Sequence, residues 1–572
     1  MPIANAAGDQ VQPKIAPTSD GGCYVSWFDS IANGFDVRLQ KLDEQGNELW
    51  SHNGVLVLDR GFSSTQDYGF DVDSGDNALL VARDDSGTGV QITASKVSPS
   101  GVLLWGPTGV QLTNTSSFVA APKIAGTADG GVVVAWLQNS SVLLQKLDGN
   151  GATLWGAGIN LTPSSGSYSV GDLHDSGTDV ILSMVHQTGS FTSPKHIVAQ
   201  KFDAAGNPLW GSTVLSIFDS GSLQFGNYPP FTPDGSGGAL FAWYGVSPLQ
   251  VYAQHVLADG TEAFPHNGVA GSTNTSRVRV SPSVSYDGAS GSTYLFWTEQ
   301  NSGQSQSGLW GQKFDAAGIR QWTNQGATLV PIGSPGIQQV KAEVSGAGAF
   351  VFWTHIPSFG TDTLEGAHVD TAGAIDIGIF SVASTPSGKS RLDTAMGATG
   401  QALLAWSDKR NDSGDIQGQN VNADGTLGSC GLGTVYCDSN PDNSSGICID
   451  TVSCASGSIN LCMTGAPPNQ FTYLLVGAGT GTITNPPGAQ GDLCLGGSQI
   501  GRYTSDAGVI DGSGSFSTDL LNAASGGGGG NLPNPPGGNL CAPAGQTWNF
   551  QYWHRAGMNP SKFSQALSVR FN

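Results

Sequence analysis

The stretch from Val132 to Trp155 reads VVVAWLQNSSVLLQKLDGNGATLW, and it contains the three marks of a unit that recurs along the chain. A first apolar strand closes on Trp136, a second ends in Gln145-Lys146, and a turn at Gly151 leads to Leu-Trp. Copies of this unit follow at intervals of about 54 residues over the first three-quarters of the sequence. A fixed period of this kind indicates a repeat architecture, in which each copy is one supersecondary unit.

The dipeptide at the end of the second strand marks the copies most clearly. It stands at Gln40-Lys41, Ser95-Lys96, Gln145-Lys146, Gln200-Lys201, Gln254-His255, Gln312-Lys313, Ala367-His368 and Gln419-Asn420. The turn glycines that follow are Gly46, Gly101, Gly151, Gly206, Gly260, Gly318, Gly373 and Gly425. A glycine at this place is what a tight hairpin with positive φ requires. The sequence therefore contains eight copies.

Within a copy the apolar residues alternate with a period of two, and each run is short and bounded by Gly, Asp, Asn or Pro. No stretch has the pattern of a helix. Four short strands per copy without helical crossovers predict an all-β fold, with an eight-bladed β-propeller over residues 1–428. The recurring tryptophans are large apolar rings, and we expect them to pack between neighbouring blades.

The start of the chain matches the middle of the repeat array. Ile3-Ala4-Asn5 and Pro13-Lys14-Ile15 align without gaps on Leu112-Thr113-Asn114 and Pro122-Lys123-Ile124. The chain thus opens with the last strand of a copy, whereas copy eight stops near Gly428 without that strand. We expect the N-terminal strand to close blade eight and remove an exposed sheet edge, or to be donated to a neighbouring molecule.

The composition is typical of a secreted protein. The chain has 23 Lys plus Arg against 44 Asp plus Glu, and 83 of its 572 residues are glycine. This acidic balance argues against nucleic acid as a partner, because phosphates require basic surfaces. No run of about 20 apolar residues occurs, so we expect no transmembrane segment.

Cysteines divide the chain at the end of the repeats. Only Cys23 precedes residue 429, and seven follow it: Cys430, Cys437, Cys448, Cys454, Cys462, Cys494 and Cys541. Without paired CxxC spacing and with one histidine in the region, disulfides in an oxidising compartment are favoured over zinc. We predict a bond between Cys494 and Cys541. The cysteines from Cys430 to Cys462 cannot be paired from sequence, and the odd thiol is free, bonds to Cys23 or bonds between chains.

Residues 429–572 carry short alternating strands separated by Pro/Gly loops, which predicts an independent disulfide-containing β-sandwich. Its motifs are Asn443-Ser444-Ser445-Gly446, the run Gly491–Gly497 (GDLCLGG) and the run Gly545–Arg555 (GQTWNFQYWHR). From Gly433 to Asn572 the chain resembles the C-terminal domain of many secreted planctomycete and myxobacterial proteins. The resemblance implies a secreted or surface protein of such a bacterium and transfers no chemistry.

The repeats resemble, more loosely, secreted bacterial propeller repeats of the WxDxR…DIYxQ type. Copy eight matches best, with Trp406-Ser407-Asp408-Lys409-Arg410 followed by Asp415-Ile416 and Gln419. Such repeats occur in extracellular proteins of many kinds. The resemblance therefore implies a scaffold and no particular activity.

No catalytic constellation stands out, and we assign no catalytic and no cofactor-binding residue. There is neither a Gly-x-Ser-x-Gly elbow nor a His-Glu-x-x-His helix. Polysaccharide lyases on propellers use His, Tyr or Arg, and His174, His186 and His196 gather in the irregular fourth copy. That copy is either a site or a drifting blade.

Metal binding is the strongest chemical hypothesis from sequence. Asp408, Asp412 and Asp415 place three carboxylates within eight residues, and oxygen ligands of this kind suit Ca²⁺. Asp438, Asn440 and Asp442 form a similar alternating set. Each set could equally be a solvated acidic loop.

Taken together, these patterns predict a non-catalytic protein, secreted or on the cell surface. We expect it to bind an extracellular glycan or protein, or to assemble with copies of itself into a surface or matrix structure. The alternative is a carbohydrate-active enzyme, a lyase or hydrolase, acting on an extracellular polysaccharide.

Overall fold

The computed structural model covers residues 1–572. It describes all of them except 32–33, 45, 66–67, 88, 334–335, 429–433, 438–439, 444, 454–457, 521, 526–530, 535–537, 542–546, 558 and 571–572. The chain divides into two compact units, one within Pro2–Leu427 and one at Gly428–Asn572.

The described part of the first unit forms eight four-stranded antiparallel sheets, numbered here in chain order. Sheet 1 consists of β2 (Gln10–Pro17), β3 (Cys23–Ile31), β4 (Gly34–Leu42) and β5 (Val55–Leu58), and sheet 2 of β6 (Gly69–Val72), β7 (Ala78–Gly87), β8 (Gly89–Val97) and β9 (Val110–Gln111). Sheet 3 consists of β10 (Val119–Gly126), β11 (Val132–Gln138), β12 (Ser141–Leu147) and β13 (Ile159–Leu161), and sheet 4 of β14 (Ser167–Ser176), β15 (Asp179–Gln187), β16 (Lys195–Phe202) and β17 (Leu215–Phe218). Sheet 5 consists of β18 (Phe231–Pro233), β19 (Ala239–Tyr244), β20 (Val251–Val256) and β21 (Val269–Ala270), and sheet 6 of β22 (Val278–Asp287), β23 (Ser292–Gln300), β24 (Ser307–Phe314) and β25 (Ala327–Gly333). Sheet 7 consists of β26 (Gly336–Val344), β27 (Gly348–Ile356), β28 (Asp362–Asp370) and β29 (Ile375–Ser387), and sheet 8 of β30 (Lys389–Met396), β31 (Ala402–Asp408), β32 (Asp415–Val421) and β1 (Pro2–Ala4).

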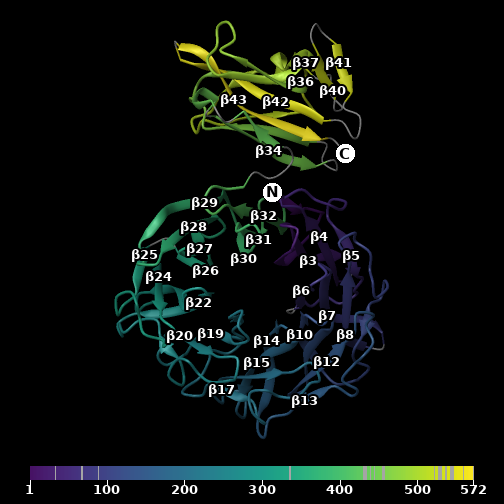
Figure 1. Ribbon diagram of the computed structural model, residues 1–572, viewed down its shortest axis with the longest axis vertical. Coiled ribbons are helices and arrows are strands. Elements are labelled where there is room, and N and C mark those ends of the chain that lie inside the picture. The colour runs from purple at the N-terminus through teal and green to yellow at the C-terminus, as the bar shows by residue number, and fades with distance from the viewer. Residues whose placement is uncertain are drawn as a thin grey trace. The chain divides into compact units, whose positions relative to one another are not determined.

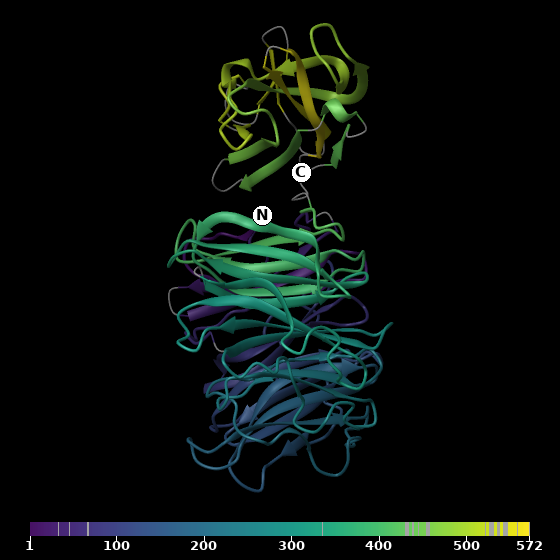
Figure 2. The same cartoon turned by 90° about the vertical axis from the view of Figure 1, so that its left-hand side faces the viewer.

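Within the first unit the sheets follow one another around a ring, with their first strands innermost (Figure 1). Figure 2 shows the same ring from its side. In seven sheets, consecutive strands are hydrogen-bonded in chain order, and the eighth takes its fourth strand from the N-terminus. The all-β fold expected from the alternating pattern is confirmed.

The recurrence of the Gln-Lys dipeptide at the end of the third strand has a hydrogen-bonding cause. Gln145 lies at the end of β12, where its Oε1 accepts the N–H groups of Lys146 and Trp155 at 3.0 Å. Its Nε2 donates to the carbonyl of Gly156 at 3.1 Å. Lys146 reaches back to Asp129 with Nζ 2.7 Å from Oδ2. One dipeptide thus satisfies the backbone of its own turn and ties that turn to the preceding one.

The turn glycine and the Leu-Trp mark meet across neighbouring sheets. Trp210 Nε1 donates to the carbonyl of Ala258 at 3.1 Å, and a Cβ on Gly260 would lie 2.9 Å from the Trp210 ring. The same indole-to-carbonyl bond joins Trp50 to Pro99, Trp105 to Gly149, Trp155 to Ala204 and Trp322 to Thr371. The glycine is therefore required both by its positive φ and by the indole against it.

The hydrophobic clusters of the first unit each combine residues of two adjacent sheets. One cluster joins Ile181 and Ile197 of sheet 4 to Phe241 and Trp243 of sheet 5. Others join sheets 1 and 2, 2 and 3, 3 and 4, 5 and 6, 6 and 7, and 7 and 8. The expectation that the tryptophans pack between neighbouring repeats is confirmed.

The N-terminal strand pairs with the last repeat of its own chain. In β1, Pro2 pairs with Gln417 and Ala4 with Ile416 of β32, antiparallel. Ile3 and Ala4 are fully buried. This is the place that the sequence match with residues 112–114 predicts for the strand, and it covers an edge that β32 would otherwise expose.

The second unit is built from antiparallel strands around its own core. Its elements are β33 (Thr434–Tyr436), η1 (Pro441–Asn443), β34 (Gly446–Ser453), β35 (Ser458–Thr464), β36 (Phe471–Thr484), β37 (Asp492–Arg502), η2 (Thr504–Asp506), β38 (Gly508–Val509), β39 (Phe516–Asp519), β40 (Asn531–Asn534), β41 (Gly538–Cys541), β42 (Thr547–Ala556) and β43 (Asn559–Arg570). A six-stranded sheet has the order β33-β43-β42-β36-β37 with β38 on β36, and β34-β35-β39 form a three-stranded sheet. Both contribute to one cluster, with Ile447 and Leu461 from the smaller sheet and Leu474, Phe550 and Leu567 from the larger.

Candidate functional site: the central pocket

A cavity of about 940 Å³ lies inside the ring of the first unit. Residues from the first strand of every one of the eight sheets line it. Among them are Lys14, Asp71, Lys123, Asp172, His174, Lys341, Glu343, Arg391 and Asp393. The wall is thus rich in charged groups, although the sheets around it pack through apolar side chains.

A repeated backbone irregularity places the lining residues. The pairing of the first two strands shifts register before Lys14, Lys123, Ser283, Lys341 and Asp393. Two residues before each of them, φ is positive: 56° at Gln12, 47° at Ala121, 53° at Ser281, 52° at Gln339 and 58° at Arg391. Such a shift is a β-bulge, which adds a residue and re-aims the side chains that follow. All five re-aimed residues line the pocket.

Charged and polar side chains in the wall bridge neighbouring sheets. Lys123 Nζ lies 3.4 Å from Asp172 Oδ1, and His174 Nε2 lies 3.0 Å from Asp172 Oδ2. On the other side Lys341 Nζ lies 3.0 Å from Asp393 Oδ1, whose second oxygen accepts the N–H of Ile15 at 3.2 Å.

Two further carboxyl groups have weaker partners. Thr394 Oγ1 donates to Glu343 Oε1 at 2.6 Å, and the N–H of Gly126 donates to Asp71 Oδ2 at 2.9 Å. Burial raises the pKa of Asp71 to about 6 and that of Glu343 to about 7, in each case against these hydrogen bonds. Both groups therefore change charge near neutral pH.

The Asp172–His174 pair behaves in the opposite way. Burial acts to raise the pKa of Asp172, but Lys123 and His174 outweigh it and hold the pKa well below its usual range. Burial acts to lower the pKa of His174, and Asp172 outweighs it, so the pKa of His174 is raised. The pair is thus an ionised carboxylate beside an imidazole that binds its proton more tightly than usual.

Arg391 differs from the other cations of the pocket. Arg391 is exposed, and its φ is 58°. Within the described residues its guanidinium makes neither a hydrogen bond nor an ion pair. Tyr228, with 49% of its surface exposed, lines the same pocket from the segment between β17 and β18. These two side chains keep their hydrogen-bonding capacity for a ligand.

The three histidines of the fourth copy do not form one cluster. His174, on β14, lines the pocket, whereas His186 and His196 face each other across β15 and β16. His186 Nε2 contacts the carbonyl of Ser165 at 3.0 Å. Only His174 therefore belongs to the candidate site.

The predicted cation loop has other partners. Asp408 is fully buried, with Oδ2 2.7 Å from Arg410 Nη2, 3.2 Å from Lys389 Nζ and 3.1 Å from Trp406 Nε1. Asp412 accepts the N–H of Gly414 at 3.0 Å, and Asp415 accepts Asn411 Nδ2 at 2.7 Å. Among the described residues, no group of three His, Cys, Asp or Glu side chains is placed to hold a metal ion.

The Trp-x-Asp-x-Arg motif in copy eight is thus a buried hydrogen-bonded ion pair. In the second set, Asn440 donates to Asp492 at 3.0 Å and Asp442 contacts Lys562 at 2.8 Å. Asp438 lies outside the described residues.

The disulfide prediction is wrong in its pairing. Cys494 is bonded to Cys437, with Cα atoms 6.1 Å apart, and so cannot bond to Cys541, whose side chain lies outside the described residues. Cys462 is also disulfide-bonded, whereas Cys23 is a buried free thiol.

Motif residues surround the Cys437–Cys494 bond. Asn443 donates to the carbonyls of Asp492 and Ser564, and Gln551 donates to the same two carbonyls. Hydrogen bonds from η1 and β42 to carbonyls of β37 and β43 therefore hold the segments beside the disulfide together, and sequence spacing does not show this arrangement.

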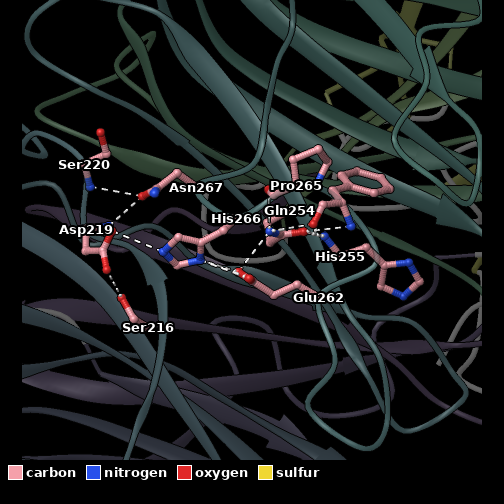
Figure 3. A network of polar contacts seen from close by, with 10 residues as sticks. Ser216, Asp219, Ser220, Gln254, His255, Glu262, Pro265, His266 and Asn267 are labelled. Carbon is pink, nitrogen blue, oxygen red and sulfur yellow. Dashed lines mark hydrogen bonds and ion pairs between the residues drawn. The ribbon is translucent and has the colours of Figure 1, made fainter.

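A second polar network lies between sheets 4 and 5 (Figure 3). His266 Nδ1 lies 2.9 Å from Glu262 Oε2 and Nε2 lies 3.2 Å from Asp219 Oδ1. Asn267 Oδ1 accepts the N–H groups of Asp219 and Ser220 at 2.8 and 3.0 Å.

The same His-Asn-Gly sequence recurs at residues 52–54. There His52 Nε2 lies 2.7 Å from Asn5 Oδ1, and Asn53 Oδ1 accepts the N–H of Asn5 at 2.9 Å. Because both networks bind the preceding sheet in the same way, we interpret them as structural contacts that hold neighbouring sheets of the ring together.

Sequence reasoning missed the pocket, although one signal for it was present. Pro13-Lys14-Ile15 matches Pro122-Lys123-Ile124, so the same lysine recurs in the first strand of two repeats. Both lysines lie at the re-aimed position of a bulge and line the pocket. A polar residue repeated inside an apolar first strand would have pointed to the interior of the ring.

No protein-family model matches the chain, and no curated protein matches it in sequence. Among solved structures, the chain is similar to an ulvan lyase of a new polysaccharide lyase family (TM-score 0.41, 11% identity, 74% of this chain and 96% of that one). It is also similar to an α-L-arabinofuranosidase from Clostridium thermocellum (0.29, 14%, 44% and 91%). A third match is prolyl oligopeptidase B from Galerina marginata (0.38, 10%, 70% and 56%). No function follows from likenesses this distant. In the described residues no helix is long and apolar enough to cross a membrane.

Proposed function

We propose that the chain is an extracellular glycan-binding protein, whose first unit is an eight-bladed β-propeller and whose second unit is a β-sandwich. The disulfide at Cys437–Cys494 and the second bonded cysteine support an oxidising compartment. The second unit would then be the shared domain of secreted bacterial proteins that its motifs resemble.

The pocket carries the proposal. Its 940 Å³ is within the range of ligand sites, and it combines Arg391 and Tyr228, which are exposed, with Ser283, Ser285 and Thr232. A saccharide presents hydroxyl groups that require several donors and acceptors on a concave wall. A wall built from eight sheets supplies them from every direction.

A glycan array on the purified chain tests this function, with a reducing-sugar assay on each glycan that binds. Binding without release of reducing ends is the expected result. Tyr228→Phe removes one hydroxyl from the pocket, and Tyr286→Phe is the matched control because Tyr286 does not line it. If no glycan binds, or if Tyr228→Phe and Tyr286→Phe bind alike and as wild type, the pocket is not a glycan site.

The second candidate is a carbohydrate-active enzyme in the same pocket. The observation in its favour is that His174, Glu343 and Tyr228, three groups able to transfer protons, share one cavity. Turnover in the reducing-sugar assay that is lost in His174→Gln would establish it. A protein or a second copy of the chain as partner is tested by size-exclusion chromatography with light scattering.

A further inference from the structure

The pocket has a charge balance unlike that of the whole chain. The chain carries a formal net charge of −21, yet four permanent cations line the pocket: Lys14, Lys123, Lys341 and Arg391. Four carboxyl groups oppose them: Asp71, Asp172, Glu343 and Asp393. The interior of the ring is therefore at least neutral inside a strongly acidic protein.

Two of the four carboxyl groups are weak acids there. Asp71 faces the N–H groups of Val72 and Gly126, with His174 and Asp175 nearby. Glu343 faces Thr394, Lys341 and Asp393. Since burial raises both pKa values towards neutrality, both groups are largely uncharged in mildly acidic solution. His174, held by Asp172 with Asp71 and Lys123 nearby, adds positive charge under the same conditions.

The four cations of the pocket also differ in the contacts that they make with other side chains. Lys341 and Lys123 each lie within ion-pair distance of a carboxylate, and the contacts of Lys14 include the Tyr68 ring, whose centre is 5.2 Å from Nζ. Arg391 has no such contact among the described residues. Its planar guanidinium matches a carboxylate or sulfate with two parallel hydrogen bonds.

We propose that the pocket binds an anionic saccharide, one that carries uronate or sulfate groups, through Arg391. The inference rests on the proposed glycan-binding function and names the class of glycan. A cavity walled by protein and lined by an excess of one charge concentrates ligands of the opposite charge. The selectivity for an anion is strongest below neutral pH, where Asp71 and Glu343 are protonated, and weakens as they ionise.

Titration calorimetry on the full chain tests the proposal with three oligosaccharides: oligogalacturonate, a sulfated galactan oligomer and a neutral galactan oligomer. We expect one or both acidic ligands to bind at pH 5, where Asp71 and Glu343 are both protonated, at least 10-fold more tightly than the neutral one. Comparison of the two acidic ligands distinguishes carboxylate from sulfate. Binding should weaken several-fold at pH 8 and in high salt.

Variants locate the interaction. Arg391→Gln should weaken binding of the acidic ligand about 10-fold or more, because one charge-assisted hydrogen bond contributes roughly 1.5–3 kcal/mol. Lys409→Gln is the control, since Lys409 is an exposed cation of sheet 8 outside the pocket lining. Glu343→Gln cannot ionise and should retain more of its affinity at pH 8 than wild type.

The outcomes separate the two proposals. If the neutral oligomer binds as tightly as the acidic ones, the class is wrong and the glycan-binding function stands. If none of the three binds and the glycan array is also negative, both fail. Acidic binding that is unchanged in Arg391→Gln, with an unchanged melting temperature, would show that the anion is held elsewhere.

Discussion

The contact between a turn glycine and the tryptophan of the preceding repeat can be tested at Gly260. A Cβ there would lie 2.9 Å from Cγ and Cδ1 of Trp210, at φ +86°. Gly211 is the matched control, because its φ is +92° and a Cβ would have nothing within 4 Å. The pair separates the cost of the backbone conformation from the cost of the collision.

The expected fall in Tm follows from the cost of the backbone conformation and the cost of the collision. Alanine at positive φ costs roughly 1–2 kcal/mol, which both substitutions share. Overpacking against the indole adds about 1–3 kcal/mol at Gly260 alone. For a unit of roughly 420 residues the entropy of unfolding is about 0.9 kcal/mol/K. Gly211→Ala should therefore lower Tm by about 1–2 °C and Gly260→Ala by about 2–5 °C.

Differential scanning calorimetry of the two variants measures these shifts. The double variant Gly260→Ala/Trp210→Leu adds a further test, because a smaller side chain relieves the collision and makes the two changes non-additive. Equal shifts for Gly260→Ala and Gly211→Ala would refute the reasoning. The glycine would then be required for its φ alone.

Three further results are expected. Cys437→Ser should destabilise the second unit by roughly 4 kcal/mol, since the bond closes a separation of 57 residues, and non-reducing peptide mapping should find Cys437 joined to Cys494 and not Cys541 to Cys494. Ile3→Ala should cost about 2–5 kcal/mol because Ile3 is fully buried in β1, whereas Leu154→Ala, at a residue 53% exposed, should change Tm little; equal effects would mean that β1 does not close the ring. Asp408→Asn leaves Lys389 buried beside a neutral amide and should cost roughly 3–5 kcal/mol at pH 7. Since the folded-state pKa of Asp408 is depressed, its stabilisation is complete above about pH 4 and lost as the pH falls further. We expect the same Tm in chelator and in millimolar calcium, and a calcium-dependent rise that Asp412→Ala removes would restore the cation hypothesis.

The repeat marks were sufficient to predict the all-β class because each makes a local contact that recurs at a similar spacing. Gln145 and Lys146 act within a single turn and its neighbour, so the dipeptide or a variant of it recurs at the same place in each copy. The strand at Ile3 could be assigned because the chain contains an intact copy to compare it with.

Contacts between distant segments that do not recur from repeat to repeat could not be predicted in this way. The bond from Cys437 to Cys494 depends on how Asn443 and Gln551 gather carbonyls from other strands. Asp408 reads as a metal ligand beside Asp412 and Asp415, but Lys389 of the adjacent strand neutralises it. Closure of the ring likewise brings Lys14, Glu343 and Arg391 to one cavity, and no spacing in the sequence encodes their meeting.

The β-bulge in the first strand of these sheets separates the residues that line the pocket from those that pack between sheets. The residue after each register shift lies at the opening of the ring, and it is already Lys, Ser or Asp in different repeats of this one chain. The inter-sheet clusters do not include these positions. A combinatorial library can therefore vary these five positions together without changing the apolar packing between sheets, although it removes the polar bridges made by Lys123, Lys341 and Asp393. The ring would then serve as a scaffold whose binding specificity is changed by substitutions at these positions.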